Sequence, residues 1–135
     1  MKSKSELLAS LDAPMTNIRW SWGAVRPRDG AVFLLVWQDE CKRVDKRLFV
    51  GLNTVAQSAE TESLQGYQER VRHVEAIRNG ARGYMLMCEA ADLSTLPRTI
   101  KRVNDSEVFV GGELRLMDDD WWLESVARQP IETVR

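Results

Sequence analysis

Three tryptophans near the start of the sequence could form the walls of a binding pocket. Trp20 and Trp22 are separated by one residue in a segment that alternates apolar and polar side chains, so a β-strand would project both rings from one face. Trp37 ends the next apolar run, and a hairpin that turns at Arg28 would bring Trp37 close to Trp20. Aromatic walls beside one acid, here Asp39, can enclose a flipped base or another flat ligand.

Basic side chains surround this predicted pocket. Arginine binds phosphate through several directed N–H groups, so a rim of arginines could hold a nucleic-acid backbone while the tryptophans read a modified or flipped base. The candidate ligand-binding residues are Trp20, Trp22, Trp37, Asp39, Arg26, Arg28, Arg43, Arg47 and Arg70. The same pattern would also arise from tryptophans that fill a core and from basic loops that face solvent, and the sequence leaves both interpretations open.

A second set of residues could carry out metal-dependent hydrolysis. Asp29 precedes an apolar strand, and Glu40 and Lys42 follow the same strand. This spacing resembles the motif of PD-(D/E)xK nucleases, which implies that Asp29 and Glu40 hold a divalent metal while Lys42 orients the attacking water. The resemblance covers residues 27–42 alone, and Pro27 is not adjacent to Asp29 as the motif prefers. A small nuclease is therefore an alternative hypothesis.

A third hypothesis is a homodimeric interaction protein without catalysis. Trp121 and Trp122 are consecutive in a predicted strand, so their rings face opposite sides of a sheet. Burying both rings requires two covering layers, and either a helix of the same chain or a second copy of the chain could supply one of them.

The remaining reactive residues assemble no further site. His73, the only histidine, lies on a predicted helix one turn after Glu69, but no serine or cysteine nucleophile can be placed beside it. Two cysteines and one histidine are too few for a structural zinc site. The run Asp118–Asp120 lacks the alternating ligands of a calcium loop. We expect no metal and no cofactor, and the sequence favours a non-enzymatic protein over an enzyme.

Composition sets the class of protein. The chain has 135 residues, of which 44% are hydrophobic, and this suits one globular domain over residues 1–135. Its 19 basic and 20 acidic side chains nearly cancel, which excludes binding to nucleic acid by bulk charge alone. Basic residues outnumber acidic ones by nine to six in residues 1–50, so a local basic face is compatible with the neutral total. Because neither a membrane-spanning run nor a secretory signal is visible, we expect a cytoplasmic protein with reduced thiols and no membrane partner.

The elements that must position these residues follow from the periodicity of apolar side chains. A period of two predicts a strand over residues 18–22. A near-continuous apolar run predicts a second strand over residues 31–38, buried on both faces and joined to the first by a turn at 26–30. A short helix is predicted over residues 5–11. Steps of three and four predict a long helix with an apolar stripe formed by Leu64, Tyr67, Val71, Val74 and Ile77. Further strands are predicted over residues 48–52, 83–89, 99–103, 107–110, 113–117 and 121–126, and loops over 39–47, 53–61, 90–97 and the tail after Arg128.

Glycine and aspartate mark the ends of several elements. Gly80 is predicted to end the long helix, Gly111–Gly112 to form a bulge or sharp corner, and Asp118–Asp120 to form a hairpin turn. Together the elements predict an α+β fold, with a mostly antiparallel curled sheet or open barrel of about seven strands. One long helix and a short N-terminal helix are predicted to pack against this sheet.

Four segments resemble a family of small bacterial proteins encoded in mobile DNA, including integron gene cassettes. They are Trp20–Ala24, Val36–Glu40, Gly66–Arg70 and Val108–Glu113. The resemblance implies an origin in a mobile element but no particular activity, because none is established for the family. The predicted arrangement of strands, helix and tryptophans is also similar in outline to PUA-like domains, which include readers of modified bases. This second similarity implies nucleic acid as a partner by analogy alone.

Overall fold

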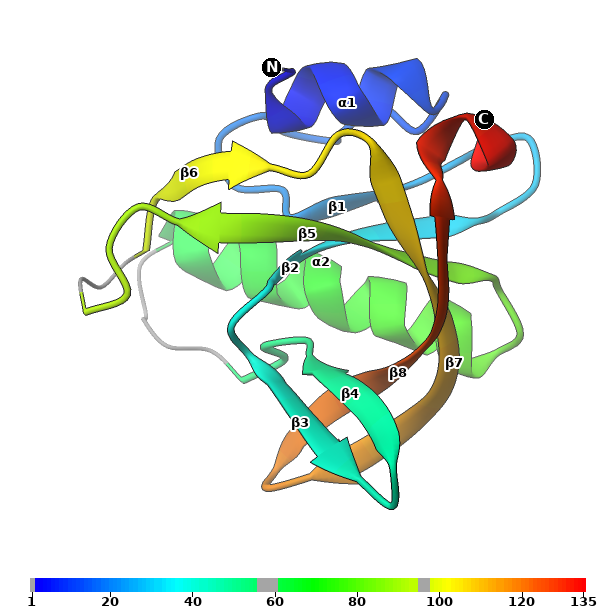
Figure 1. The fold of residues 1–135 in the computed structure, drawn as a ribbon. Helices are drawn as coiled ribbons and strands as arrows, with labels where there is room; N and C mark the ends of the chain where they lie inside the picture. The colour runs from blue at the N-terminus through cyan, green and yellow to red at the C-terminus, as the bar shows by residue number, and fades with distance from the viewer. Residues whose placement is uncertain (1, 56–60, 95–97) are drawn as a thin grey trace.

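The structure is a computed structural model that describes residues 2–55, 61–94 and 98–135. Its elements in chain order are α1 (Lys4–Ser10), β1 (Gly23–Val25), β2 (Val32–Trp37), β3 (Cys41–Val44), β4 (Arg47–Gly51), α2 (Thr61–Arg78), β5 (Gly83–Ala90), β6 (Ile100–Val103), β7 (Glu107–Met117), β8 (Asp120–Pro130) and a 3-10 turn, η1 (Ile131–Val134). The strands form one sheet in the order β1–β2–β5–β7–β8–β4–β3, and β6 pairs with β5 outside this path. The sheet curls without closing, which confirms the predicted α+β class with an open sheet (Figure 1).

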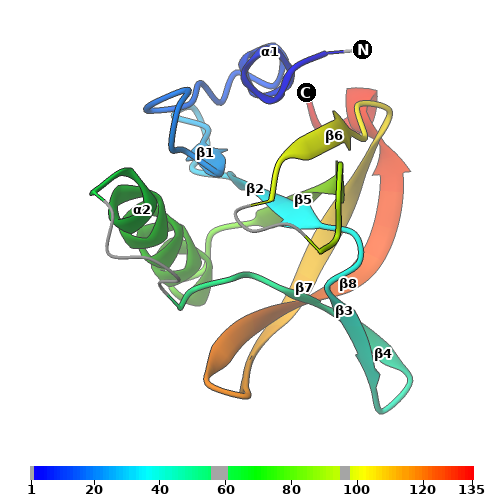
Figure 2. The same ribbon diagram turned by 90° about the vertical axis from the view of Figure 1, so that its left-hand side faces the viewer.

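Strands β2 and β5 form the centre of the fold. They run parallel, with Val32 opposite Gly83 and Trp37 opposite Cys88. The other strand pairs in the described part of the chain are antiparallel, as the sequence predicts for most of the sheet. Phe33 belongs to the core cluster on the α1 side, whereas Val32 belongs to the cluster on the α2 side, and Figure 2 shows the two helices on opposite sides of the pair. Because both faces are covered, β2 is apolar at every position.

The short N-terminal helix is present where the sequence predicts it. The Ser3 hydroxyl accepts a hydrogen bond from the backbone N–H of Glu6, and the Glu6 carboxylate accepts one from the backbone N–H of Ser3. This reciprocal arrangement satisfies donors that the first turn leaves unpaired. Leu7 and Leu8 are buried in the core, so α1 closes one side of the central strand pair.

Residues 41–51 form a hairpin in which β3 and β4 pair antiparallel, with Cys41 opposite Val50. Most of the segment 39–47 is therefore not a loop, and that prediction was wrong. The turn residues Asp45 and Lys46 have φ angles of 53° and 66°, the conformation of a two-residue hairpin turn. Such turns are usually marked by glycine in the sequence, and Asp-Lys lacks that signal.

The last four predicted strands form β6 and one long hairpin, β7–β8. The hairpin pairs from Glu107 opposite Pro130 to Met117 opposite Asp120, and register shifts around Gly111 confirm the predicted bulge. Asp118 and Asp119 have φ angles of 52° and 64°, which confirms the predicted turn. The segment after Arg128 was predicted to be loose, but β8 continues to Pro130, and Ile131 and Val134 of η1 are buried in the core beside α1.

Helix α2 turns a different face to the sheet from the one predicted. Its extent and its end before Gly80, which has a φ angle of 108°, agree with the sequence. Of the predicted apolar stripe, however, Val74 alone is fully buried, and Leu64 is exposed. From Leu64 onward, the other buried residues of α2 are Gly66, Glu69, Arg70 and His73. A Cβ atom on Gly66 would lie 2.7 Å from the backbone oxygen of Trp20, so the glycine allows this close approach.

Candidate functional site

The predicted strand that carries Trp20 and Trp22 is mostly a turn. The side chain of Asn17 accepts a hydrogen bond from the Arg19 backbone N–H at 2.8 Å, and the Asn17 carbonyl accepts one from the Ser21 N–H at 2.9 Å. These local bonds compete with strand pairing. Because β1 begins only at Gly23, the two tryptophans do not share a strand face, and that prediction was wrong.

Trp22 is the tryptophan that packs against Trp37. Their ring centroids are 5.5 Å apart and their planes are tilted by 51°. A flat ligand between two rings needs parallel planes about 7 Å apart, because each side of the ligand requires a van der Waals separation of about 3.5 Å. The two rings therefore contact each other instead of forming the walls of a slot.

Cations of the same chain lie over both of these rings. Lys4 Nζ is 4.6 Å from the centroid of Trp22, and Arg98 Cζ is 5.4 Å from the centroid of Trp37. Burial lowers the pKa of Lys4. Arg98 donates two hydrogen bonds to the carboxylate of Asp39, at 2.8 and 2.9 Å. The predicted acid of the pocket is thus engaged by an arginine that sequence reasoning did not single out.

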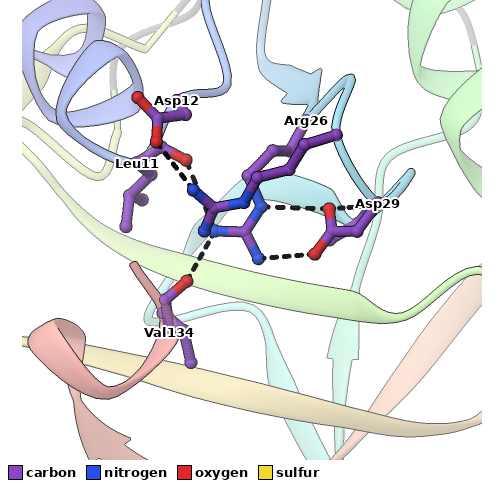
Figure 3. A network of polar contacts seen from close by, with 7 residues as sticks. Leu11, Asp12, Arg26, Asp29 and Val134 are labelled. Atoms are coloured by element: carbon purple, nitrogen blue, oxygen red, sulfur yellow. Dashed lines mark hydrogen bonds and ion pairs between the residues drawn. The ribbon is translucent and has the colours of Figure 1, made fainter.

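Arg26 was predicted to belong to the basic rim, and the structure places it in the interior with an exposed fraction of 5% (Figure 3). Its Nη1 donates to the carbonyl groups of Leu11 and Val134, and its Nε and Nη2 donate to the two carboxylate oxygens of Asp29. The hydrogen bonds from Arg26 are the main reason why the pKa of Asp29 falls to about 2. Arg26 therefore joins the end of α1, the β1–β2 turn and η1.

The other arginines of the predicted rim are dispersed. Arg28 forms an ion pair with Asp12 beside the β1–β2 turn, at 2.8 Å. Arg47 binds both carboxylate oxygens of Glu124, at 2.7 and 2.8 Å, and these hydrogen bonds lower the pKa of Glu124 to about 2. Arg43 is exposed on β3. Since β1 and β3 lie at opposite ends of the strand order, these residues do not line one pocket.

Arg70 is almost fully buried beneath α2. Its two terminal nitrogens donate hydrogen bonds to the carbonyl groups of Leu52, Trp22 and Leu35, at 2.8, 2.8 and 2.5 Å. Burial lowers the pKa of Arg70 to about 10, so the side chain is still charged at neutral pH. The carbonyl groups it binds belong to three separate segments, which identifies Arg70 as a structural residue.

The residues of the predicted nuclease motif lie apart. Asp29 precedes β2 and Glu40 follows it, so the length of this strand, about 20 Å for six residues, separates the two acids. Two carboxylates at opposite ends of one strand cannot hold the same metal ion. Lys42 pairs instead with Asp118, at 2.6 Å. Among the residues that the structure describes, no three histidine, cysteine or acidic side chains form a potential metal site.

The buried histidine and cysteine are poorly suited to catalysis. Burial and the nearby charges of Arg70 and Arg72 lower the pKa of His73 to about 4. Burial raises the pKa of Cys88 to about 12, so its thiol is protonated at neutral pH. Glu69, one helical turn before His73, is buried and accepts a hydrogen bond from the hydroxyl of Ser21. His73 and Glu69 therefore belong to the buried face of α2, and Cys88 belongs to the core cluster on the α1 side.

A groove that the sequence did not predict lies between the end of α2 and the β7–β8 hairpin. It consists of two adjoining open cavities of about 320 and 470 Å³, which share Ile77 and Gly112. The full lining of the two cavities is Ile77, Arg78, Gly80, Ala81, Arg82, Gly83, Tyr84, Val110, Gly111, Gly112, Leu114, Trp121 and Gln129. We call this set of residues the arginine groove, because Arg78 and Arg82 are the charged side chains among the described residues that line it.

The two arginines of the arginine groove are both exposed. Arg82 forms no ion pair or side-chain hydrogen bond with any residue in the described ranges. Arg78 lies over Trp121, with Cζ 5.1 Å from the ring centroid, and pairs with Glu75 at 2.9 Å. Contacts of these two kinds at exposed sites each contribute about 0.5 kcal/mol, so Arg78 is only weakly held.

Trp121 and Trp122 are partly buried, each by contacts within the chain. Trp121 packs against the core cluster on the α2 side, beneath Arg78. Trp122 contacts the β3–β4 hairpin, with Lys42 Nζ 4.4 Å from the ring centroid, and donates an indole hydrogen bond to the carbonyl of Met117. The chain itself therefore supplies part of the cover predicted for each ring, on both sides of the sheet.

Only the fold brings the arginine groove together. Arg78 and Arg82 flank a glycine turn, and Gly111–Gly112 was recognised as a bulge, but thirty residues separate the two features in the sequence. Strand pairing places them side by side, because Tyr84 of β5 lies opposite Val110 of β7. The one sequence feature that could have pointed to this site is the pair Arg78 and Arg82, which lie on either side of the helix-ending Gly80.

No helix in the described part of the chain is long and apolar enough to cross a membrane. No family model, curated protein or solved structure matches this chain at a significant level. Function must therefore be inferred from the residues of the candidate site.

Proposed function

We propose that this protein is a non-catalytic binding module for nucleic acid and that the arginine groove is its contact surface. The observation that carries the proposal is the lining of the groove, which combines two exposed arginines with one tryptophan in a chain of net charge −1. The described residues that line it include no acid, and Glu75 pairs with Arg78 from outside this lining. Arginine suits phosphate, and an aromatic ring suits the face of a base. The function predicted from the sequence is retained, and its site moves away from Trp22 and Trp37.

The number of arginines defines the expected electrostatics. A protein that neutralises phosphates of a single strand loses affinity as salt rises, with a logarithmic slope of about −0.7 for each phosphate. Contacts from Arg78 and Arg82 predict a slope of about −1.4, far smaller than that of strongly basic proteins. The affinity should therefore be modest, in agreement with the near-neutral charge of the chain.

The test measures the binding of short fluorescent oligonucleotides by anisotropy over a range of salt concentrations. Arg82→Ala should weaken binding and reduce the slope to about −0.7. The matched control is Arg102→Ala, which removes the same charge from β6, at the other end of β5 from the groove. Equal affinities and slopes for the two variants, or no binding at low salt by the unmodified protein, would contradict the proposal.

The place of action and the assembly state follow from other residues. Cys41 and Cys88 are both free thiols, and Cys88 is fully buried. Free thiols are typical of a reducing compartment, which supports the cytoplasm as the site of action. Contacts within the chain already bury part of Trp121 and Trp122, so the two rings do not by themselves call for a homodimer.

A further inference from the structure

We infer that the arginine groove takes single-stranded rather than duplex nucleic acid, with an unpaired base stacked on Trp121 in place of the guanidinium of Arg78. This inference rests on the proposed function and specifies the class of nucleic acid. It starts from the position of Trp121, which lines the groove beside Ile77, Gly112 and Leu114 while packing against the core. A ring held by the core and bordering an open cavity is a fixed platform for stacking.

The present neighbour of this platform is a cation that can move. Arg78 is the last residue of α2, its side chain is half exposed, and its partners among the described residues are Glu75 and the ring itself. Glu75 is also half exposed. Water can therefore replace both partners of Arg78 at little cost when a base occupies the ring. The displaced guanidinium remains at the groove, where it can bind the phosphate next to that base.

Stacking of a base on Trp121 favours single-stranded over duplex nucleic acid. In a duplex, each internal base already stacks on its neighbours through both faces, whereas a single strand can turn one base outward at small cost. A protein that reads duplex DNA inserts a helix or β-ribbon into the major groove of the DNA. The arginine groove is concave, and its described lining presents no such protruding element. The geometry therefore combines one base platform, Trp121, with two cations, Arg78 and Arg82, along a single backbone.

The inference is tested by comparing a short single strand of thymidylate with a duplex of the same length, using anisotropy at low salt. The single strand should bind more tightly. Trp121→Leu should weaken single-strand binding by about 5- to 150-fold, the range found for loss of one stacked base. Trp121→Phe keeps an aromatic face and should stay close to the unmodified protein. Circular dichroism and thermal unfolding establish whether each variant is folded.

A measurement on the unmodified protein keeps the test valid if Trp121→Leu does not fold. In a two-dimensional NMR spectrum, the indole N–H signal of Trp121, assigned with Trp121→Phe, should shift when the single strand is added. The indole signals of Trp20 and Trp22 should shift less, because neither residue lines the groove.

The possible failures are distinguishable. Equal binding of single strand and duplex, with an effect of Arg82→Ala but no effect of Trp121→Leu and no shift of the Trp121 indole, would overturn this inference and leave the proposed function in place. Absence of binding to both oligonucleotides at low salt would overturn the proposed function and this inference together.

Discussion

Residue type alone does not distinguish a binding arginine from a structural one. Arg70 and Arg26 are buried, and most of their N–H groups donate to backbone carbonyls or to Asp29. A guanidinium has five donors and no acceptor, so one that is already bonded inside the fold has little left for a phosphate. Arg82 has the opposite surroundings, because it is exposed at the groove without a partner in the described chain.

Arg70→Leu should destabilise the protein strongly. The carbonyl groups of Leu52, Trp22 and Leu35 would lose charge-assisted hydrogen bonds, and the loss of such buried partners costs about 3 kcal/mol in unfolding free energy. Urea unfolding at neutral pH measures the effect. Arg72→Leu, an exposed position on the same helix, should change stability by no more than about 0.5 kcal/mol and is the matched control.

His73 should make stability depend on pH. Its pKa in the folded protein is about 4, below its usual value of 6.5, because of burial and of the charges on Arg70 and Arg72. Between these two pKa values the unfolded chain binds the proton and the folded chain does not, so stability falls as pH drops from 6.5 toward 4. Urea unfolding should show a loss of about 2 kcal/mol between pH 7 and pH 5.

The same comparison for His73→Leu isolates this contribution. The lowered carboxyl pKa values of Asp29 and Glu124, both about 2, affect stability mainly below pH 5. The variant should therefore be nearly flat between pH 7 and pH 5. If the unmodified protein is equally stable at both pH values, the burial of a neutral His73 is contradicted.

At the scale of elements, the bulge in β7 shapes the arginine groove. Register shifts on both sides of Gly111 bend the β7–β8 hairpin, so that one end pairs with β5 and the other with β4. Gly111 and its neighbour Gly112 line one of the two cavities of the groove, together with Gly83. The arginine groove therefore forms where the bend of β7 faces the end of α2.

Gly111→Ala should distort this bend. An added Cβ would lie 2.7 Å from a methyl group of buried Leu123 and 2.8 Å from the backbone oxygen of Gly83, and neither atom can easily move. Overpacking of this kind costs about 2 kcal/mol. Gly112→Ala meets the side chains of Val126 and Glu124 instead and should cost less. Thermal unfolding of both variants tests the difference, and a larger loss for Gly112→Ala would refute this account of the bend.

At the scale of the molecule, one cluster of contacts joins segments that are distant in the sequence. Ile131 and Val134 pack into the core beside α1, and the Val134 carbonyl accepts a hydrogen bond from Arg26 (Figure 3). The last residues therefore complete the cover over one face of the β2–β5 pair.

Removing residues 131–135 should consequently lower the unfolding free energy by about 4 kcal/mol, because two apolar side chains are no longer buried. Removal of Arg135 alone is the control, since this residue is exposed and lies outside the core clusters. Urea unfolding of both shortened chains measures the effect, and equal stability would contradict a structural role for η1.

The fold class, the long helix, the bulge and the buried strands could be predicted because periodicity and glycine encode them locally. The turn at residues 17–21 and the turn at Asp45–Lys46 were missed, because side-chain hydrogen bonds and positive φ angles without glycine leave little trace in the sequence. The face of α2 was mispredicted because Arg70 meets carbonyl groups from remote segments. The arginine groove also depends on segments that are distant in the sequence, because the pairing of β5 with β7 joins its two halves, so it could not be predicted.

The most direct test of the central claim is to map the binding of a short single-stranded oligonucleotide by NMR titration of the backbone amides. Shifts concentrated at residues 80–83 and at Gly111 and Gly112 are the predicted result, since these residues line the arginine groove. Shifts concentrated around Trp22, Trp37 and Arg98, or no shifts at low salt, would contradict the assignment of the groove as the binding surface.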